Sequence, residues 1–225
     1  MDIIQIRSLF EGVFIMKRMV IFIMISLLVC GGFYISKQNE LKNEQEMLES
    51  ISSKIIRFHV LANSDSKEDQ ELKLKVRDEV LKFISPKLKD CNDIEESRAV
   101  IKKYNKEIIN ISEKVIRKNG YKYGVKSNLA QENFPVKTYG NITLPQGEYE
   151  AYRILIGNAE GQNWWCLMFP PLCFADITKV EVDEQKAEKE MKTVLNDEEY
   201  DFINNKSGKS KIKVKSKIVE WIKSL

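Results

Sequence analysis

The sequence is poor in the residue types on which several classes of protein depend. It has one histidine, four cysteines, five prolines and ten glycines in 225 residues. One histidine excludes a metal site built from several histidines, and four cysteines exclude a small disulfide-rich protein. The low glycine and proline content excludes a collagen-like or low-complexity chain. With 43% hydrophobic residues, the chain has enough apolar side chains for a folded domain.

A net positive charge is confined to one segment. Residues 206–225 hold seven lysines and one glutamate, a net charge of +6, which leaves −3 for the rest of a chain whose total is +3. A nucleic-acid-binding domain normally carries a basic face over much of its surface. The sequence therefore predicts a near-neutral body with a basic tail, and no nucleic-acid partner.

One long uncharged run lies near the N-terminus. Lys17 and Arg18 precede residues 19–36, which as a helix would be about 27 Å long, close to the roughly 30 Å of a bilayer's hydrocarbon core. The run predicts a transmembrane anchor or a signal segment, with residues 1–18 as a cytoplasmic stub and the body outside the cytoplasm. Cleavage of the segment stays open, and so does a true start at Met16.

The remainder of the chain divides by composition into three parts. Residues 37–53 are polar and helix-prone, and predict a juxtamembrane spacer helix. Residues 54–180 contain most of the patterned apolar segments and predict an exported α+β domain. Residues 181–225 predict an acidic helix followed by a lysine-rich C-terminal tail.

The first half of the predicted domain reads as a strand followed by two helices. The apolar, β-branched run 54–62 predicts a buried strand, and Ser64 or Ser66 can cap the helix that follows. Apolar residues at helical spacing predict that helix over 67–84, stopped by Pro86. A second continuous apolar face predicts a helix over 93–118.

The second half alternates between short apolar runs and turns, which is typical of strands. We expect three or four strands after residue 120, joined by the strand at 54–62. The predicted fold class is therefore α+β: a two-layer domain with an antiparallel sheet of about four to five short strands and two long helices on one face. A single N-terminal transmembrane or signal helix precedes it.

His59 is the only candidate for imidazole chemistry. It can act as a general base with Asp65 or a cysteine as its partner, or it can be a hydrogen-bonded histidine at a strand end. No nucleophile turn of the Gly-x-Ser-x-Gly type accompanies it. The sequence therefore predicts no catalytic residues, no cofactor and no metal site.

Two cysteines flank a Pro-Pro pair outside the predicted span. Cys166 and Cys173 are seven positions apart, and in an exported protein a disulfide across this loop is reasonable. Cys91 would then be a free thiol, while Cys30 belongs to the uncharged run.

The pair Trp164-Trp165 is the most distinctive local feature. Adjacent residues on a strand face opposite ways, so one tryptophan can be core while the other meets solvent, a lid or a partner. Gln162 and Asn163 precede the pair. The arginines on apolar elements, which are Arg57, Arg77 and Arg153, are expected to pair with Asp78 or Glu150.

Two blocks of the sequence resemble a known family. IRFHVLANSDSKEDQELKLKVRDEVL at 56–81 and FPVKTYGNITLPQGEYEAYRILIGNAEGQNWWCLMFPPLCF at 134–174 are similar to the stage II sporulation protein R family of endospore-forming bacteria. The resemblance implies a signal made in the forespore and exported into the space between the forespore and mother-cell membranes. There it would trigger stage II sporulation protein GA, a membrane-embedded aspartic protease, to process pro-sigma-E.

The resemblance brings no catalytic residues to this chain, so three hypotheses stand. The first is a binding module that activates the protease by contact, with the membrane reached through residues 19–36. The second is an exported hydrolase that uses His59 with Asp65, and the third is a structural protein of the cell envelope. The oligomeric state stays open. The candidates for partner binding are His59, Asn63, Asp65, Gln162, Asn163, Trp164 and Trp165.

Overall fold

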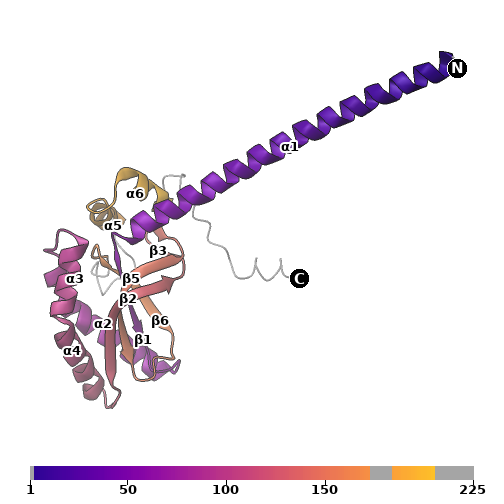
Figure 1. The fold of residues 1–225 in the computed structure, drawn as a ribbon. Coiled ribbons are helices and arrows are strands. Elements are labelled where there is room, and N and C mark those ends of the chain that lie inside the picture. Colours follow the sequence, from indigo (N-terminus) through magenta and orange to yellow (C-terminus); the bar gives the residue numbers. More distant parts are fainter. Residues whose placement is uncertain (1–2, 173–183, 206–225) are drawn as a thin grey trace. The chain divides into compact units, whose positions relative to one another are not determined.

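A computed structural model describes residues 3–172 and 184–205 of the chain, and before residue 26 it describes only the side chains of Met19 and Met24. The chain forms two compact units, Met1–Met47 and Leu48–Leu225. Each is considered by itself below. Figure 1 labels the helices and strands along the sequence.

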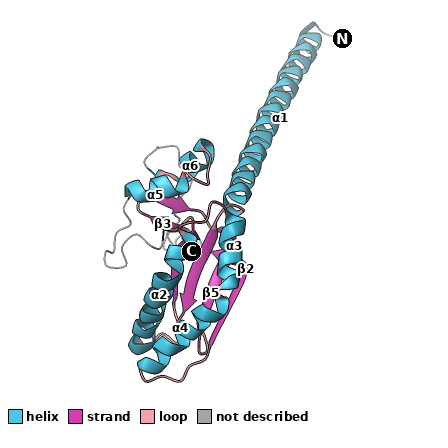
Figure 2. Ribbon diagram, turned by 90° about the vertical axis from the view of Figure 1, so that its left-hand side faces the viewer, coloured by secondary structure: helices cyan, strands magenta, loops and turns pink. Residues whose placement is uncertain are grey.

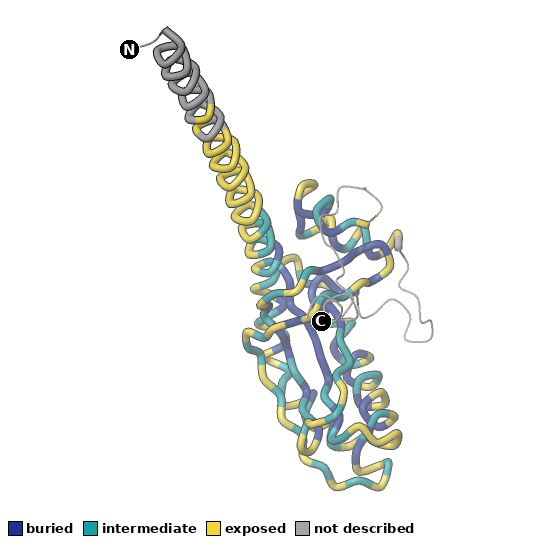
Figure 3. Tube along the Cα trace, turned by 90° about the vertical axis from the view of Figure 1, so that its right-hand side faces the viewer, coloured by how far each residue is buried: buried dark blue, intermediate teal, exposed yellow. Residues whose placement is uncertain are grey.

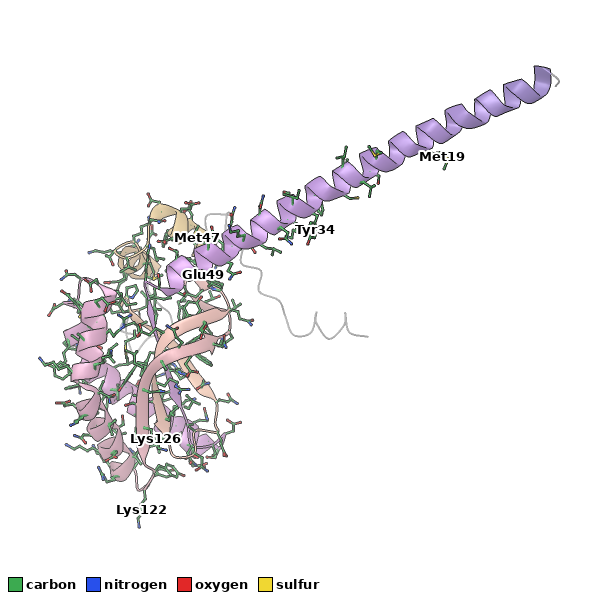
Figure 4. The ribbon with its side chains drawn as sticks, in the orientation of Figure 1. Met19, Tyr34, Met47, Glu49, Lys122 and Lys126 are labelled. Carbon is green, nitrogen blue, oxygen red and sulfur yellow. The ribbon has the colours of Figure 1, made fainter. Side chains whose placement is uncertain are left out.

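The first unit is helical. Helix α1 (Ile3–Ser52) runs without a break through the segments predicted as stub, span and spacer, so the boundaries at residues 18 and 36 do not interrupt the backbone. Its described side chains between Met19 and Leu41 are exposed (Figure 3), and Figure 4 labels Met19 and Tyr34 among them. Over the residues whose side chains are described, no helix is long and apolar enough to cross a bilayer.

The second unit is α+β and is built on a four-stranded sheet. Its strands are β2 (Val125–Phe134), β5 (Gly147–Ile156), β1 (Ile56–Leu61) and β6 (Asn163–Phe169), in that order across the sheet. Strand β5 is antiparallel to β2, and β1 is antiparallel to β6. The α+β class and the participation of the segment at 54–62 in the sheet are thereby confirmed.

The prediction of an antiparallel sheet was wrong in one pairing. Strand β1 lies parallel to β5, with Phe58 opposite Tyr152 and Val60 opposite Ile154, so the sheet is mixed. Strand β5 inserts between β1 and β2 rather than adding to the outer edge. Alternation of apolar residues reports which strand face is buried, but it carries no information on the direction of the neighbouring strand.

Three helices cover one face of the sheet, as Figure 2 shows for α2, α3 and α4. Helix α2 (Lys67–Leu88) is capped by Ser66, whose Oγ accepts a hydrogen bond from the Asp69 N–H at 3.2 Å, and this confirms the predicted cap. The helix passes through Pro86 instead of stopping before it. A proline in the last turn removes one intrahelical hydrogen bond, and the helix ends two residues later, at Leu88.

The predicted helix over 93–118 is two helices. Helix α3 (Ile94–Lys103) and helix α4 (Asn105–Lys118) meet at Tyr104, whose backbone leaves the helical region at φ −97° and ψ 11°. The Asn105 side chain accepts hydrogen bonds from Ser127 and Tyr152 of the sheet, each at 2.7 Å. The apolar spacing continues across the break, so periodicity alone predicted a single helix.

A small hairpin and two short helices complete the described part of this unit. The hairpin consists of β3 (Lys137–Tyr139) and β4 (Ile142–Leu144), and the helices are α5 (Glu184–Met191) and α6 (Asp197–Ile203). Within the described residues the acidic stretch holds these two short helices, where a single helix was predicted. The lysine-rich tail lies outside the described residues.

The main core lies between the sheet and helices α2–α4. Phe58 and Val60 of β1 pack with Tyr152 and Ile154 of β5 and with the apolar stripe of α2, and all are almost fully buried. Figure 3 shows these strands as the buried centre of the unit. Because strand residues alternate, the residues between them point to the opposite face of the sheet. We call it the open face because helices α2–α4 do not lie on it, although Arg57, Tyr149 and Leu167 on this face are buried.

Candidate functional site

The two tryptophans of β6 lie on opposite faces of the sheet, as the alternation predicts. Trp164 is the register partner of Val60 and faces the helices, where its ring meets Phe58 edge-on at 5.9 Å. The Arg77 guanidinium lies 4.7 Å from the centre of the Trp164 ring. Trp164 is half-buried and belongs to the rim of the main core.

Trp165 belongs to the open face and packs against the only histidine. It is the register partner of His59, and the two rings are stacked at 4.9 Å with 8° between their planes. The Phe134 ring meets Trp165 edge-on at 4.7 Å, and the Lys137 ammonium lies 5.8 Å from the centre of the Trp165 ring. Trp165 is partly exposed, as Trp164 is, but it lies on the face that helices α2–α4 do not cover.

His59 is buried without a catalytic partner. It is 4% exposed, and neither ring nitrogen forms a hydrogen bond. Burial lowers the pKa of His59 from 6.5 to about 4; nearby Asn163 opposes this shift, and the charges of Arg153 and Arg57 add to it. The imidazole is therefore neutral at pH 7.

Asp65 forms its hydrogen bond with the loop before β6 and does not orient the His59 imidazole. Its Oδ1 accepts a hydrogen bond from the Gln162 N–H at 2.7 Å, which joins the loop after β1 to the start of β6. The Gln162 carbonyl oxygen in turn accepts a hydrogen bond from buried Lys73 at 2.8 Å. The described geometry therefore gives Asp65 and Gln162 a role in holding two loops together.

Asn63 makes a second connection between the same loops. Its Oδ1 accepts a hydrogen bond from the Asn158 N–H at 3.0 Å, and its Nδ2 donates to Asp69 at 2.9 Å. A Cβ atom on Gly157, where φ is +58°, would lie 2.2 Å from Asn63 Oδ1. Glycine is required there by both the backbone conformation and the close approach.

Asp69, which sequence reasoning treated only as a helix-end charge, is the buried centre of this loop network. It accepts hydrogen bonds from Ser64 Oγ at 2.6 Å and from Asn63. Burial alone would raise the pKa of Asp69, but the hydrogen bonds from Ser64, Asn63, Tyr123 and Ser66 outweigh it and lower that pKa. The signal was available in the sequence as an Asx- and Ser-rich turn before a helix.

The three arginines singled out in the sequence have three different environments. Arg77 pairs with Asp78 at 2.6 Å, as predicted, whereas Arg153 pairs with Glu132 at 2.6 Å. Glu150 is paired by Arg98, at 2.7 Å, which the sequence reasoning did not consider. Arg57 forms no ion pair with any described residue, which contradicts the expectation for it.

Arg57 is instead held by aromatic rings. It is fully buried, and its guanidinium carbon lies 4.2 Å from the centre of the Phe134 ring and 4.8 Å from that of Tyr149. Its Nη2 donates one hydrogen bond to the Tyr139 hydroxyl at 3.1 Å, while Nε and Nη1 have no partner. Burial raises the pKa of Tyr139 and of Tyr149, and Arg57 opposes both shifts.

Among the described residues, no group of three histidine, cysteine or acidic side chains is arranged to hold a metal ion. Cys30 and Cys91 are free thiols, and Cys166 is buried on β6. Cys173 lies outside the described residues, so the disulfide between Cys166 and Cys173 stays a prediction.

Comparison with known proteins identifies the family. The family model described as stage II sporulation protein R matches residues 52–179, and no solved structure matches the chain. Stage II sporulation protein R of Bacillus subtilis (strain 168) is 36% identical over 220 residues, which cover 93% of this chain and 98% of that protein. The resemblance of the two sequence blocks is thereby confirmed, and the chain belongs to the stage II sporulation protein R family.

Proposed function

We propose that this protein is an exported sporulation signal that activates a membrane-embedded aspartic protease by contact, so that the protease processes pro-sigma-E. Membership of the stage II sporulation protein R family supports a role in sporulation. The observation that favours contact over chemistry is the state of His59. It is buried, neutral and stacked on Trp165, and its ring nitrogens have no hydrogen-bond partner.

Activation by contact requires that binding favours the active state of the partner. A ligand shifts an equilibrium only by the difference between its affinities for the two states. The protein therefore needs a surface that the active protease matches better than the inactive one. We assign that surface to the open face around Trp165, because a partly exposed tryptophan packed against other rings, here His59 and Phe134, is a typical anchor of a protein interface.

We further propose that the second unit acts in the space between the forespore and mother-cell membranes. The charge pattern supports this orientation, since Lys17 and Arg18 precede the uncharged run 19–36. A reporter enzyme that is active only outside the cytoplasm, fused after Leu225, should be active in sporulating cells. Activity of a cytoplasmic reporter alone at that position would contradict the proposed compartment.

The experiment that separates contact from catalysis compares three full-length variants in sporulating cells. His59→Gln retains a polar side chain but removes the titrating base, so processing of pro-sigma-E should survive. Trp165→Ala removes the proposed anchor, and a hot-spot tryptophan contributes about 2 kcal/mol or more, or roughly thirtyfold in affinity. Immunoblots of pro-sigma-E and its product measure processing.

Trp164→Ala is the matched control, because Trp164 has the same chemistry on the face covered by helices. We expect it to lower stability more than signalling, as measured by unfolding of the purified protein. Loss of processing in folded, exported His59→Gln, together with normal processing in Trp165→Ala, would reject the contact mechanism in favour of the hydrolase.

A further inference from the structure

Strand β2 is one edge of the four-stranded sheet, as Figure 2 shows, and only one of its sides is paired. All ten of its residues pair with β5 in a continuous antiparallel register. One step before β2, the Gly157 N–H donates to the Gly124 carbonyl oxygen at 2.9 Å. Hydrogen-bonded and non-hydrogen-bonded positions alternate along such a ladder, so the even-numbered residues of β2 bond to β5. The odd-numbered residues from Val125 to Asn133 therefore direct their N–H and C=O groups outward.

The outward backbone groups of β2 are unprotected. Within residues 3–172 and 184–205, no group forms a hydrogen bond with them. Edge strands usually carry a proline, a bulge or several lysines, which keep other strands from pairing with them. Strand β2 has no proline and no register shift, and Lys126 is its one lysine. An edge of this length and regularity is a template for pairing with a further strand.

The sequence of β2 is complementary to itself. When two copies pair antiparallel about a two-fold axis at Leu129, the outward odd-numbered residues of one copy meet those of the other, as the ladder requires. Lys126 of each copy then lies opposite Glu132 of the other. This is a non-hydrogen-bonded position, where the Cα atoms are about 4.5 Å apart and the side chains are closest. Of the registers that the alternation allows, this one brings the two opposite charges of the strand together.

Leu129 lies at the centre of this register and has uncovered apolar surface beside it. It is partly exposed at the rim of the main core, on the face of the sheet that the helices cover. Leu129 lines a half-open pocket of about 220 Å³, together with Tyr152, Ile101 and Asn105. The pocket is smaller than the roughly 300–1,000 Å³ of a typical small-molecule site. A leucine from a second copy, placed directly opposite on the same face, adds apolar contact at this point.

The helices leave room for a second copy. Helix α4 approaches β2 at Ser127, whose Oγ donates a hydrogen bond to Asn105, the first residue of α4, at 2.7 Å. Ser127 belongs to the first half of β2, whereas Gln131 and Asn133 in the second half are exposed on the same face. In an antiparallel pair, the first half of one strand lies opposite the second half of the other. Helix α4 of each copy therefore meets an uncovered stretch of its partner.

We propose that β2 is the interface of a symmetric homodimer, in which residues 125–133 of two copies pair antiparallel about Leu129. The result is one continuous sheet with four strands from each copy. Because both copies use the same edge, the assembly closes as a dimer and does not grow into a filament. Strand β6, with Trp165, lies at the opposite edge of the sheet and stays free. This inference goes beyond the proposed function and does not depend on it.

A disulfide at the two-fold axis tests the register. The full-length protein in detergent, with Cys30 and Cys91 replaced by serine, supplies the background. With Leu129→Cys, the two new thiols face each other across Cα atoms about 5.5 Å apart, within the range of a disulfide. We expect a covalent dimer on mild oxidation, seen by non-reducing electrophoresis. Gln131→Cys is the matched control, because the two residues 131 are four positions apart along the strands, about 13 Å, and cannot be bridged.

A charge change tests the cross-strand pairs. Lys126→Glu places like charges opposite each other at two positions of the dimer, and should weaken association about tenfold. Lys122→Glu makes the same charge change outside the paired residues, and should leave association almost unchanged. Figure 4 labels both lysines. Sedimentation equilibrium of the full-length protein in density-matched detergent measures the dissociation constant.

A proline tests the edge without disturbing the ladder to β5. Residue 131 directs its N–H outward, so Gln131→Pro removes only an outward donor and should abolish the dimer, whereas Gln131→Ala should retain it. Circular dichroism confirms that each variant is folded. A monomer at all concentrations, equal cross-linking at residues 129 and 131, or unchanged association in folded Gln131→Pro overturns the interface. A β2 edge that pairs with a different protein also gives a monomer in this experiment, and so rejects the homodimer.

Discussion

His59 and Trp165 are register partners on β1 and β6, and their rings stack at 4.9 Å, almost parallel. This pairing keeps the imidazole out of water beside two arginines, Arg57 and Arg153, whose charges disfavour its protonation. The stacked pair therefore connects the proposed contact surface to the acid stability of the domain.

Folding should become less favourable as the pH falls through the titration range of His59. The pKa of His59 is about 4 in the folded protein against 6.5 for the free side chain, so the unfolded chain binds the proton more readily. The free energy of unfolding should fall by about 3 kcal/mol from above pH 6.5 to below pH 4. Urea unfolding followed by tryptophan fluorescence measures it.

His59→Gln is the variant that isolates this effect. In this variant the free energy of unfolding should depend less on pH between pH 6.5 and 4.5, because no other described group with a shifted pKa titrates across that window. Asp69 and Glu199 have lowered pKa values, so their contributions are present above pH 4.5 and are lost only at lower pH. An unchanged slope in His59→Gln would show that His59 is not responsible.

Much of the fold follows from local pattern, but pairing direction does not. The stripe of α2, the Ser66 cap and the opposite faces of Trp164 and Trp165 all depend on residue spacing within one element. The parallel alignment of β1 with β5 depends on which strand inserts between two others, and that is decided by the whole sheet. Side-chain alternation is the same in either direction.

The candidate site was likewise predictable from the sequence only in part. Trp165 and His59 were recognised from the sequence because the chain has only three tryptophans and one histidine. Arg57 was expected to pair with an acid, since charged residues on apolar strands usually do, and its aromatic surroundings come from residues up to 92 positions away, such as Tyr149. The periodicity of residues within one element cannot predict contacts between residues so far apart in the sequence.

The loops at the end of the β1–β6 pair should not tolerate a Cβ atom at Gly161. A Cβ there would lie 2.2 Å from the backbone oxygen of Ser64, and backbone cannot yield as a flexible side chain can. Gly161→Ala should therefore destabilise the protein by about 1–3 kcal/mol. Gly124→Ala is the control, because nothing lies within 4 Å of its Cβ position, and thermal unfolding compares the two. Equal melting temperatures would contradict the close approach.

A disulfide between Cys166 and Cys173 predicts a definite count of free thiols. Protein that is unfolded without reductant should label at two cysteines, Cys30 and Cys91, which are free in the structure. Reduction before labelling should raise the count to all four cysteines of the chain. Loss of a bridge over so short a loop would cost about 2–3 kcal/mol. Four labelled cysteines before reduction would exclude the bridge.

Glu199 should be the residue whose loss most weakens the attachment of α6. It is 2% exposed and accepts hydrogen bonds from Lys54 at 2.6 Å and Ser50 at 2.5 Å, besides closing a capping box with Asn196. Burial opposes its ionisation, but these partners lower the pKa of Glu199 overall.

Glu199→Gln keeps the size of the side chain and removes its charge. Because Lys54 is about one-third exposed, water screens part of its ion pair, and we expect a cost of about 1–2 kcal/mol. Glu198→Gln, one position earlier and exposed, should cost almost nothing. Hydrogen exchange of α6 should accelerate in the first variant alone; equal protection in both would show that the ion pair with Lys54 does not hold this helix.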